Sequence, residues 1–589
     1  MAQILLTSFA GYPYTPSSLM PDNGLASLAG ALIEAGHEVK ILDFGTVDTI
    51  SRLFPSRLSS RVKPLAEKLF LEGKDFAWHE KARFLWRAWQ LQRHQRKEIA
   101  AIAREVVQEA EDFKADIVGL KLWNGDGFSG SVRIAKAIKN ELPDVTVLAG
   151  GPQVDYFGTH ILEYTDAFDA LIAGEGERTV PELVSAIVNG QSWDGISGLI
   201  WHDGNEIRRN TNEAIESLDE LPLPVYDEEV YPALAGNQKI KIGVVDESRG
   251  CPNRCAFCIH PIKSGGKWAL KPSRRVISEM ERIMDQMGTR YFIYAGSNTS
   301  GKVAVEIAEA ILREGLDVRY GCFGHVRGIR RKRNRTRAGD PPEKKAPQDD
   351  RDLLSPNRRR SDFDLLRESG CLAIFYGLES GSPRILREAF EKPLNLEDAE
   401  EVIEATKEAG MRAITSVIYP APFEDDESRA KTMDFLKRVR PDSVPITIPG
   451  MIPGTPWQKH PEKYGFEMAD RDDLWEYALT YKIKLLFPPS MWKPLPYSLN
   501  GKSSKQMFKE CQDFGNDLED AGILTHVPHE MVLMADALDQ ADDLKGFRDR
   551  SRVQFLSGDT ETVAQTVRKI NGHVGGRRRV VKTQEPAMA

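Results

Sequence analysis

Cysteine is scarce in this chain, with six in 589 residues. So few thiols cannot form a disulfide framework, and reduced thiols are typical of the cytosol. No apolar run approaches the ~20 residues that span a bilayer, and the opening MAQILLTSFA lacks the basic region and cleavage site of a secretory signal. The formal net charge of -8 argues against a general nucleic-acid binder. We therefore expect a cytoplasmic protein that has no membrane span and for which nucleic acid is an improbable partner.

Half of the cysteines lie together in the run ESRGCPNRCAFCIHP. Cys251, Cys255 and Cys258 have the spacing CxxxCxxC, and no second CxxC follows to complete a structural zinc site. Three thiolates suit a four-iron four-sulfur cluster in which one iron stays open for a substrate or cofactor. The alternatives are three incidental thiols, or a zinc site with His260 as fourth ligand. Pro261 after that histidine is more typical of a chain leaving a loop.

Residues 1–205 predict an α/β domain built on a doubly wound parallel sheet. The expected strands are 3–8, 38–43, 116–122, 145–149 and 170–173, with helices such as 24–36 and 129–142 between them. Ligands of such sheets bind outside the carboxyl ends of the strands. The loops that should line one site are 7–14, 123–127, 150–153 and 174–177. Their glycines would let the backbone approach a bulky ligand.

A helical insertion at about 45–115 separates the second and third strands, and Trp78, Trp86 and Trp89 cluster in it. We expect a cap whose aromatic side chains bury against the sheet domain, because aromatic residues dominate core energetics. The alternative is a cap that shields a bound ligand or helps to bind substrate.

The stretch 206–235 is polar and interrupted by prolines, which predicts a linker. From 236 to 455 strands and helices alternate again. Six candidate parallel strands lie at 240–246, 291–295, 318–322, 372–377, 412–418 and 443–448.

Charged residues and prolines crowd residues 327–361, which predicts a disordered surface insertion. A basic run can contact RNA or anionic lipid, but acidic residues dilute this one, so we prefer a solvated loop. Residues 574–589 predict a flexible tail.

Residues 456–573 predict a mainly helical C-terminal domain, with one helix at 504–521. Trp457, Trp492 and Tyr497 are candidates for lining a substrate pocket, although ordinary packing would explain them equally well.

The cysteine spacing, with Phe257 before the third cysteine, resembles the signature of radical S-adenosylmethionine (SAM) enzymes. Together with GGP at 150–152 and GEGE at 174–177, it resembles their cobalamin-binding class and is similar to the class B methyltransferases. The resemblance covers about residues 1–455. It implies a cobalamin-binding sheet domain, a partial (β/α)6 barrel with its active site at the carboxyl strand ends, and a C-terminal domain over the barrel mouth. It also implies three cofactors, namely a 4Fe-4S cluster, SAM and cobalamin, and an external one-electron donor such as flavodoxin.

The resemblance implies which residues hold each cofactor. Cys251, Cys255 and Cys258 would bind the cluster. The implied SAM contacts are Phe257, Gly296, Ser297, Asn298, Glu379 and Ser416. For Glu379 the alternative is a carboxylate at a helix N-terminus that Ser380 or Ser382 caps. The implied cobalamin contacts are Thr7, Ser8, Tyr12, Trp123, Asn124, Gly125, Gly150, Gly151, Pro152, Gln153, Gly174, Glu175 and Gly176. The first loop, SFAGYPYTP, contains no histidine, so we expect cobalamin without a histidine ligand from that loop.

The expected function is methylation of a carbon centre, or as a second choice a phosphorus centre, in a small-molecule, lipid or peptide natural-product precursor. In the resembling family the cluster cleaves SAM to a carbon radical and cobalamin supplies the methyl group, so no general base is assigned. The alternatives are a cobalamin-assisted cyclisation or rearrangement, and modification of RNA. The methylthio-transferring RNA branch needs cysteines before Cys251, and this chain has none there.

Overall fold

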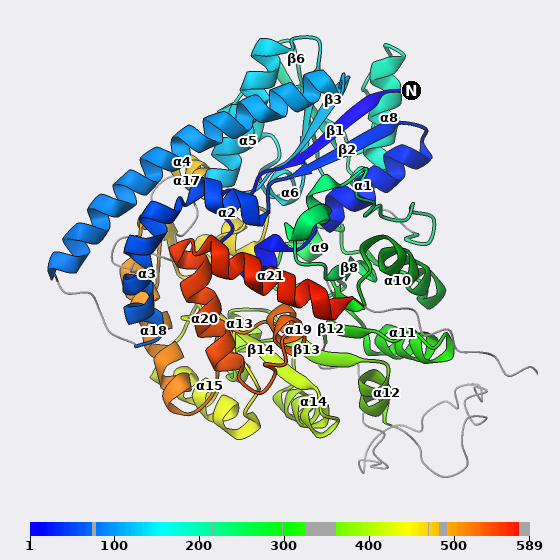
Figure 1. Cartoon of the computed structure of the whole chain (residues 1–589). Helices are drawn as coiled ribbons and strands as arrows, with labels where there is room; N and C mark the ends of the chain where they lie inside the picture. The colour runs from blue at the N-terminus through cyan, green and yellow to red at the C-terminus, as the bar shows by residue number, and fades with distance from the viewer. Residues whose placement is uncertain are drawn as a thin grey trace, which may run out of the picture.

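The computed structural model describes residues 1–72, 78–213, 217–296, 298–325, 361–468, 471–481 and 492–575. The predicted insertion at 327–361 and tail at 574–589 fall almost wholly outside these ranges, as does Ser297. Two sheets organise the chain, one of seven strands and one of six. Figure 1 shows the first sheet above the second, with the C-terminal helices packed beside both.

The first sheet has the order β2-β1-β3-β4-β5-β6-β7, and its first five strands are parallel. The strands are β1 (Gln3–Ser8), β2 (Glu38–Asp43), β3 (Ile117–Lys121), β4 (Thr146–Gly150), β5 (Ala170–Ile172), β6 (Leu199–Asp203) and β7 (Glu206–Arg209). The predicted doubly wound sheet is confirmed. The antiparallel pair β6 and β7 extends its edge, so the first residues assigned to a linker are instead strand.

Helices cover both faces of this sheet, α1 and α8 on one and α4 and α5 on the other (Figure 1). In α1 the buried Leu25, Ala29 and Leu32 recur at helical spacing, which makes one apolar stripe. The helices of this part are α1 (Asn23–Glu34), α2 (Val47–Leu53), α3 (Ser56–Phe70), α4 (Trp78–Asp112), α5 (Asp126–Glu141), α6 (Pro152–Phe157), α7 (His160–Tyr164) and α8 (Gly176–Val188), with the 3-10 turn η1 (Pro16–Leu19).

The helical insertion consists of α2, α3 and α4. Phe84, Ala88 and Leu91 bury one side of α4. Trp86 and Trp89 are each 56% exposed, so the prediction that these aromatics bury is wrong. Residues 84, 88 and 91 share one face of the helix, and residues 86 and 89 lie on the opposite face. The side chain of Trp78 lies outside the described part of the chain.

The second sheet has the order β15-β14-β13-β12-β11-β8, and all its pairs are parallel, as predicted. The strands are β8 (Gly243–Val245), β11 (Tyr291–Tyr294), β12 (Arg319–Gly324), β13 (Cys371–Glu379), β14 (Arg412–Ile418) and β15 (Ile446–Thr447). Helices between successive strands complete a partial barrel. They are α10 (Ser273–Met287), α11 (Gly301–Arg313), α12 (Asp362–Glu368), α13 (Pro383–Glu388), α14 (Leu396–Glu408) and α15 (Asp426–Val439).

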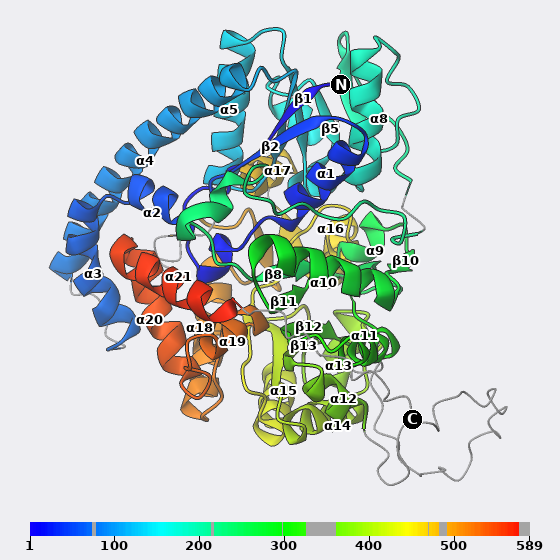
Figure 2. The ribbon, with the colours of Figure 1, turned by 45° about the vertical axis from the view of Figure 1, so that its right-hand side comes forward.

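The C-terminal region is mainly helical and reaches back to the first part of the chain. Its elements are α16 (Pro456–Lys459), η4 (Pro461–Tyr464), β16 (Phe466–Met468), α17 (Arg471–Thr480), β17 (Tyr497–Leu499), α18 (Ser504–Asp520), α19 (His529–Asp536), α20 (Leu544–Ser557) and α21 (Thr560–Val574). Helix α19 packs on β12, β13 and β14, whereas α20 packs on α3 and α21 on α2. Figure 2 shows α20 and α21 beside these insertion helices. Among the described residues no helix is long and apolar enough to cross a membrane.

The segment between the two sheets is fixed by buried polar contacts. Tyr226 and Tyr231, which precede its PALAGN turn η2 (Pro232–Asn237), are fully buried and stack with ring centroids 6.4 Å apart. The Tyr231 hydroxyl and the Lys239 ammonium both donate to Asp43 at the end of β2. The Lys239 and Asp43 side chains are only 1% and 5% exposed, so each charge depends on the other.

We expect Lys239→Met to lower the free energy of unfolding by about 3 kcal/mol or more, because it leaves the Asp43 carboxylate buried without its cation. Urea denaturation of the full chain measures the change. The matched control is Lys241→Met, since Lys241 pairs with the half-exposed Glu228 and should contribute less than about 1 kcal/mol. Equal losses in the two variants would contradict this assignment.

Candidate functional site

The cluster loop begins just after β8, at the carboxyl edge of the second sheet. A short hairpin frames it, in which β9 (Ser248–Gly250) pairs antiparallel with β10 (Trp268–Leu270), and α9 (His260–Lys263) lies between them. Gly250 has φ +79°, and a Cβ there would lie 2.2 Å from the Lys267 carbonyl oxygen. Only glycine fits this position, from which the chain turns into Cys251.

The three thiols of the loop are partly buried and close enough to influence one another. Burial raises the pKa of Cys255 to about 11; Cys258 and Cys251 add to the rise and Lys392 opposes it. In the described ranges no three His, Cys, Asp or Glu side chains converge on a point for one metal ion. Thiolates of an iron-sulfur cluster bind different irons and need no such convergence.

Aromatic residues support the back of the cluster loop. The Ala256 N–H donates to the Phe390 carbonyl at 2.8 Å, and the Phe257 ring meets the Phe390 ring edge-on at 5.5 Å. Trp457 is fully buried beside both rings, and its indole N–H donates to the Ala389 carbonyl at 2.8 Å. Trp457 therefore packs behind the cluster loop, which favours the packing alternative over a substrate contact.

Two consecutive carboxylates, Asp246 and Glu247, link β8 to this loop. Glu247 is fully buried and accepts the Gly296 N–H at 2.9 Å and the Thr299 hydroxyl. Burial raises the pKa of Glu247 to about 7, although the Thr299 hydrogen bond favours the charged form. A Cβ on Gly296 would lie 2.2 Å from the Glu247 carboxylate. These contacts fix the loop after β11, in which the predicted Asn298 lies.

A buried ion pair lies at the end of β13. Lys392 Nζ is 3.0 Å from Glu379 Oε1, and the two side chains are 9% and 8% exposed. The Ser416 hydroxyl donates to the other Glu379 oxygen at 3.1 Å, so the structure brings these two predicted residues together. Burial lowers the pKa of Lys392, but Glu379 and Cys255 outweigh it and the pKa is raised. Helix α13 starts at Pro383 with Ser382 at its N-cap, as the alternative expected, but Glu379 lies three residues before that cap and no acidic residue occupies the first turn.

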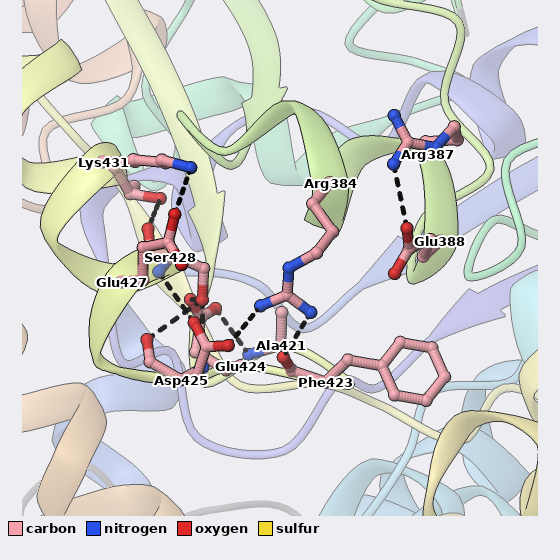
Figure 3. A network of polar contacts seen from close by, with 11 residues as sticks. Arg384, Arg387, Glu388, Ala421, Phe423, Glu424, Asp425, Glu427, Ser428 and Lys431 are labelled. Carbon is pink, nitrogen blue, oxygen red and sulfur yellow. Dashed lines mark hydrogen bonds and ion pairs between the residues drawn. The ribbon is translucent and has the colours of Figure 1, made fainter.

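A polar network holds the ends of β13 and β14 together (Figure 3). Arg384 of α13 donates to the Asp425 carboxylate at 2.6 Å and to the Phe423 carbonyl at 3.2 Å. Asp425 in turn caps α15, accepting the Ser428 N–H at 2.8 Å. The network keeps the loop after Glu379 next to the loop that follows β14.

The first sheet offers a second site where β1 and β3 lie side by side, the point at which its strand order reverses. Thr7, at the end of β1, is fully buried, and its hydroxyl has no hydrogen-bond partner within the described ranges. The neighbouring Ser8 hydroxyl accepts the Trp123 indole N–H at 3.0 Å. Gly151 has φ +94°, and a Cβ there would lie 3.0 Å from the Lys121 side chain. Gly150 and Gly151 lead into α6, in which Pro152 is the first residue and Gln153 is buried.

The C-terminal region covers part of this edge. Tyr12 is 4% exposed, and its hydroxyl donates to the Phe555 carbonyl of α20 at 2.6 Å. This contact packs Tyr12 against α20, and its role as a cobalamin contact stays a prediction. The Gly125 N–H, next to Asn124, donates to the Leu479 carbonyl of α17 at 2.8 Å. No sequence pattern indicated that α17 would lie here.

Arg249 connects the carboxyl edge of the first sheet with that of the second. We call Arg249 and its partners Glu175, Glu177 and Asp246 the Arg249 clasp. The Arg249 guanidinium pairs with Glu175 in the loop after β5, at 2.6 Å with Glu177 in the first turn of α8, and at 2.5 Å with Asp246. Burial raises the pKa of Glu175 and outweighs the opposing effect of Arg249. The carboxylate predicted to contact cobalamin is thus ion-paired with this arginine. Gly174 and Gly176 flank Glu175.

A second ion pair connects the same two sheet edges. Lys263 of α9 pairs with Asp155 of α6 at 2.6 Å, and the same carboxylate accepts the Gly174 N–H at 2.7 Å. The loops after β4 and β5 of the first sheet are therefore both tied to the cluster loop.

Comparison with known proteins identifies both parts of this site. The B12 binding domain model matches residues 92–184, and the Radical SAM superfamily model matches residues 248–436. The chain is a B12-binding radical SAM enzyme. The enzyme is 27% identical over 387 residues to an uncharacterised methyltransferase of Pyrococcus horikoshii, across 65% of this chain and 73% of that protein.

Two further proteins are similar to this chain, one in sequence and one in fold. Cytidylyl-2-hydroxyethylphosphonate methyltransferase of Streptomyces wedmorensis is 23% identical over 426 residues, which cover 66% of this chain and 74% of that protein. The solved structure of TsrM, a radical SAM methyltransferase from Kitasatospora setae with cobalamin and a 4Fe-4S cluster bound, has a similar fold. The two structures superpose with a TM-score of 0.58 at 14% sequence identity, and the match covers 96% of this chain and 100% of the TsrM chain. The B12-binding radical SAM enzyme thus uses a 4Fe-4S cluster, SAM and cobalamin, and its relatives include methyltransferases.

Sequence reasoning about the enzyme missed Glu247, Arg249 and Lys392. The first two lie in the run DESRGC beside the cluster cysteines, where closely spaced opposite charges were the available signal. Lys392 had no local signal, because its partner Glu379 lies in another element.

The remaining substrate candidates differ in their burial. Tyr497 is 8% exposed and its hydroxyl donates to the Pro449 carbonyl at 2.8 Å, so it packs in the core rather than in a pocket. Trp492 is half-buried and meets the Phe508 ring edge-on at 4.8 Å.

Glu247 should make stability depend on pH near neutrality. Because its pKa is raised from 4.5 to about 7 on folding, the folded enzyme binds a proton there and loses relative stability as pH rises through 7. A glutamine at this position would mimic the protonated form at every pH. We expect the difference in melting temperature, Glu247→Gln minus wild type, to be larger at pH 8 than at pH 6. A difference that is constant over this interval would contradict the assignment.

Proposed function

We propose that the enzyme transfers a methyl group to a carbon centre, or as a second choice a phosphorus centre, of a small-molecule, lipid or peptide natural-product precursor. The Arg249 clasp is the observation that carries this proposal, because it ties the strand-end loops of the B12-binding domain to the cluster loop. The relatives that are methyltransferases add support. Cobalamin supplies methyl-transfer chemistry when bound, and the protein orients and shields the reactants.

SAM binding is assigned to the carboxyl edge of the second sheet. The methionyl part of SAM carries an ammonium and a carboxylate, and the buried pair of Glu379 and Lys392 offers one complementary charge to each. The pair lies close enough to Cys255 for Lys392 to influence the thiol pKa. Phe257, Gly296, Asn298 and Ser416 complete the assigned contacts, and the predicted Ser297 lies outside the described residues.

Cobalamin binding is assigned to the reversal point of the first sheet. The unpartnered Thr7 hydroxyl fits a ligand that carries amide groups, and Gly151 leaves room for its approach. The assigned contacts are Thr7, Ser8, Tyr12, Trp123, Asn124, Gly125, Gly150, Gly151, Pro152, Gln153, Gly174, Glu175 and Gly176. The loop after β1 contains no histidine, so cobalt would bind without a ligand of that type from this loop.

Substrate and reductant complete the proposal. Trp492 is the predicted aromatic residue that stays partly exposed in the C-terminal region, and we assign it to the substrate pocket. The electron comes from an external one-electron donor such as flavodoxin.

Lys392→Met should weaken SAM binding at least tenfold, because Glu379 would then be buried without its cation and the SAM carboxylate would lose its partner. Equilibrium dialysis with labelled SAM against the cluster-loaded enzyme measures this, and iron content shows that the cluster is retained. The control is Lys463→Met, since Lys463 pairs with the exposed Glu391. Equal affinity in the Lys392 and Lys463 variants would refute the SAM assignment.

Methyl transfer itself is tested with deuteromethyl-labelled SAM. The holoenzyme, a chemical reductant and a metabolite extract from cells that lack the enzyme are incubated together and analysed by mass spectrometry. We expect S-adenosylhomocysteine, and a product that carries the labelled methyl group. Formation of 5′-deoxyadenosine with neither of these would reject methyl transfer and favour the cyclisation or rearrangement alternative.

A further inference from the structure

Helix α4 exposes an apolar stripe to solvent, which we call the α4 stripe and define as Leu85, Trp86 and Trp89. Their exposed fractions are 52%, 56% and 56%. Residues three and four apart share a helix face, so the three side chains are neighbours. The opposite face is already used, because Phe84, Ala88 and Leu91 are buried. Within the described residues, the buried side of α4 is therefore not the side that carries the stripe.

Basic residues surround the stripe. Residues 78–97 contain six Lys or Arg residues and one acidic residue, Glu80, in a chain whose formal net charge is -8. The exposed cations are Lys81, Arg83, Arg93, Arg96 and Lys97. The Arg93 guanidinium lies over the Trp89 ring, 5.8 Å from its centroid. The surface thus combines tryptophan rings with a local excess of positive charge.

We propose that the α4 stripe docks on an anionic lipid surface. Helices that lie in the membrane interface place Trp and Leu on one side and Lys and Arg around them, as here. Tryptophan favours this region because its ring is apolar and its N–H is polar. A second copy of the chain is a poorer occupant, because a two-fold contact would bring the same cations together.

The position of α4 suits this role. In Figures 1 and 2 the end of α4 nearest the stripe forms the outer edge of the molecule, beyond the first sheet and away from α9 and the cluster loop. A lipid surface could therefore approach without contacting the cluster loop. The inference is independent of the proposed methyl transfer.

The test is flotation of the full-length holoenzyme with vesicles of phosphatidylcholine alone or with phosphatidylglycerol added. We expect binding to the anionic vesicles, with a blue shift of tryptophan fluorescence. The double variant Trp86→Gln and Trp89→Gln should bind at least tenfold more weakly. Each of Arg83→Gln and Arg93→Gln should weaken binding about fivefold, as expected for a charge near an anionic surface. The matched control replaces two exposed apolar residues elsewhere, Val188→Gln with Leu312→Gln, and should bind like wild type.

Iron content, cobalamin content and melting temperature should be equal in all variants, because the substituted side chains are exposed. Absence of wild-type flotation, or equal flotation of the tryptophan and control variants, would overturn the proposal. So would a dimer in size-exclusion chromatography that dissociates only in the tryptophan variant, since the stripe would then bind a second copy. Retention on RNA without vesicle binding would also overturn it.

Discussion

The guanidinium of Arg249 is shared by three carboxylates, and the relation between the two halves of the site depends on it. Glu175 comes from the loop after β5, Glu177 from the first turn of α8, and Asp246 directly follows β8. All four side chains are at most 20% exposed, so removing the arginine would leave three poorly solvated negative charges side by side. Charge balance therefore favours an arrangement in which the first sheet's edge lies against the cluster loop. The Lys263–Asp155 pair stabilises the same arrangement.

The dipeptide Asp246-Glu247 extends this constraint to the second sheet. Successive side chains of an extended chain point to opposite sides. Asp246 pairs with Arg249, whereas Glu247 accepts the Gly296 N–H at 2.9 Å. The two residues that follow β8 thus connect the B12-binding edge with the loop assigned to SAM.

Local sequence was sufficient to predict both parallel sheets and to single out the loop that carries the three clustered cysteines. Buried parallel strands are short hydrophobic runs, and the cysteine spacing is itself local. It was insufficient for β7, whose alternation is weak because most of its residues are exposed. Local sequence was also insufficient to predict that Tyr12 and Trp457 are buried, because their hydrogen-bond partners lie 543 and 68 residues away along the chain. In α4 the helical period allowed two apolar faces, and only tertiary packing decides that Phe84 is buried and Trp86 exposed.

The most direct measurement is pulsed electron paramagnetic resonance of the holoenzyme, with cluster and cobalt both reduced to paramagnetic states, on wild type and Arg249→Gln. We expect one narrow distribution of cluster-to-cobalt distances in wild type, and a broad one in the variant because the two edges separate. The control Arg208→Gln removes a half-exposed arginine that pairs with Asp203 at 2.6 Å and should leave the distribution unchanged. A narrow, wild-type distribution in Arg249→Gln would show that the clasp does not set the relation between the two cofactors.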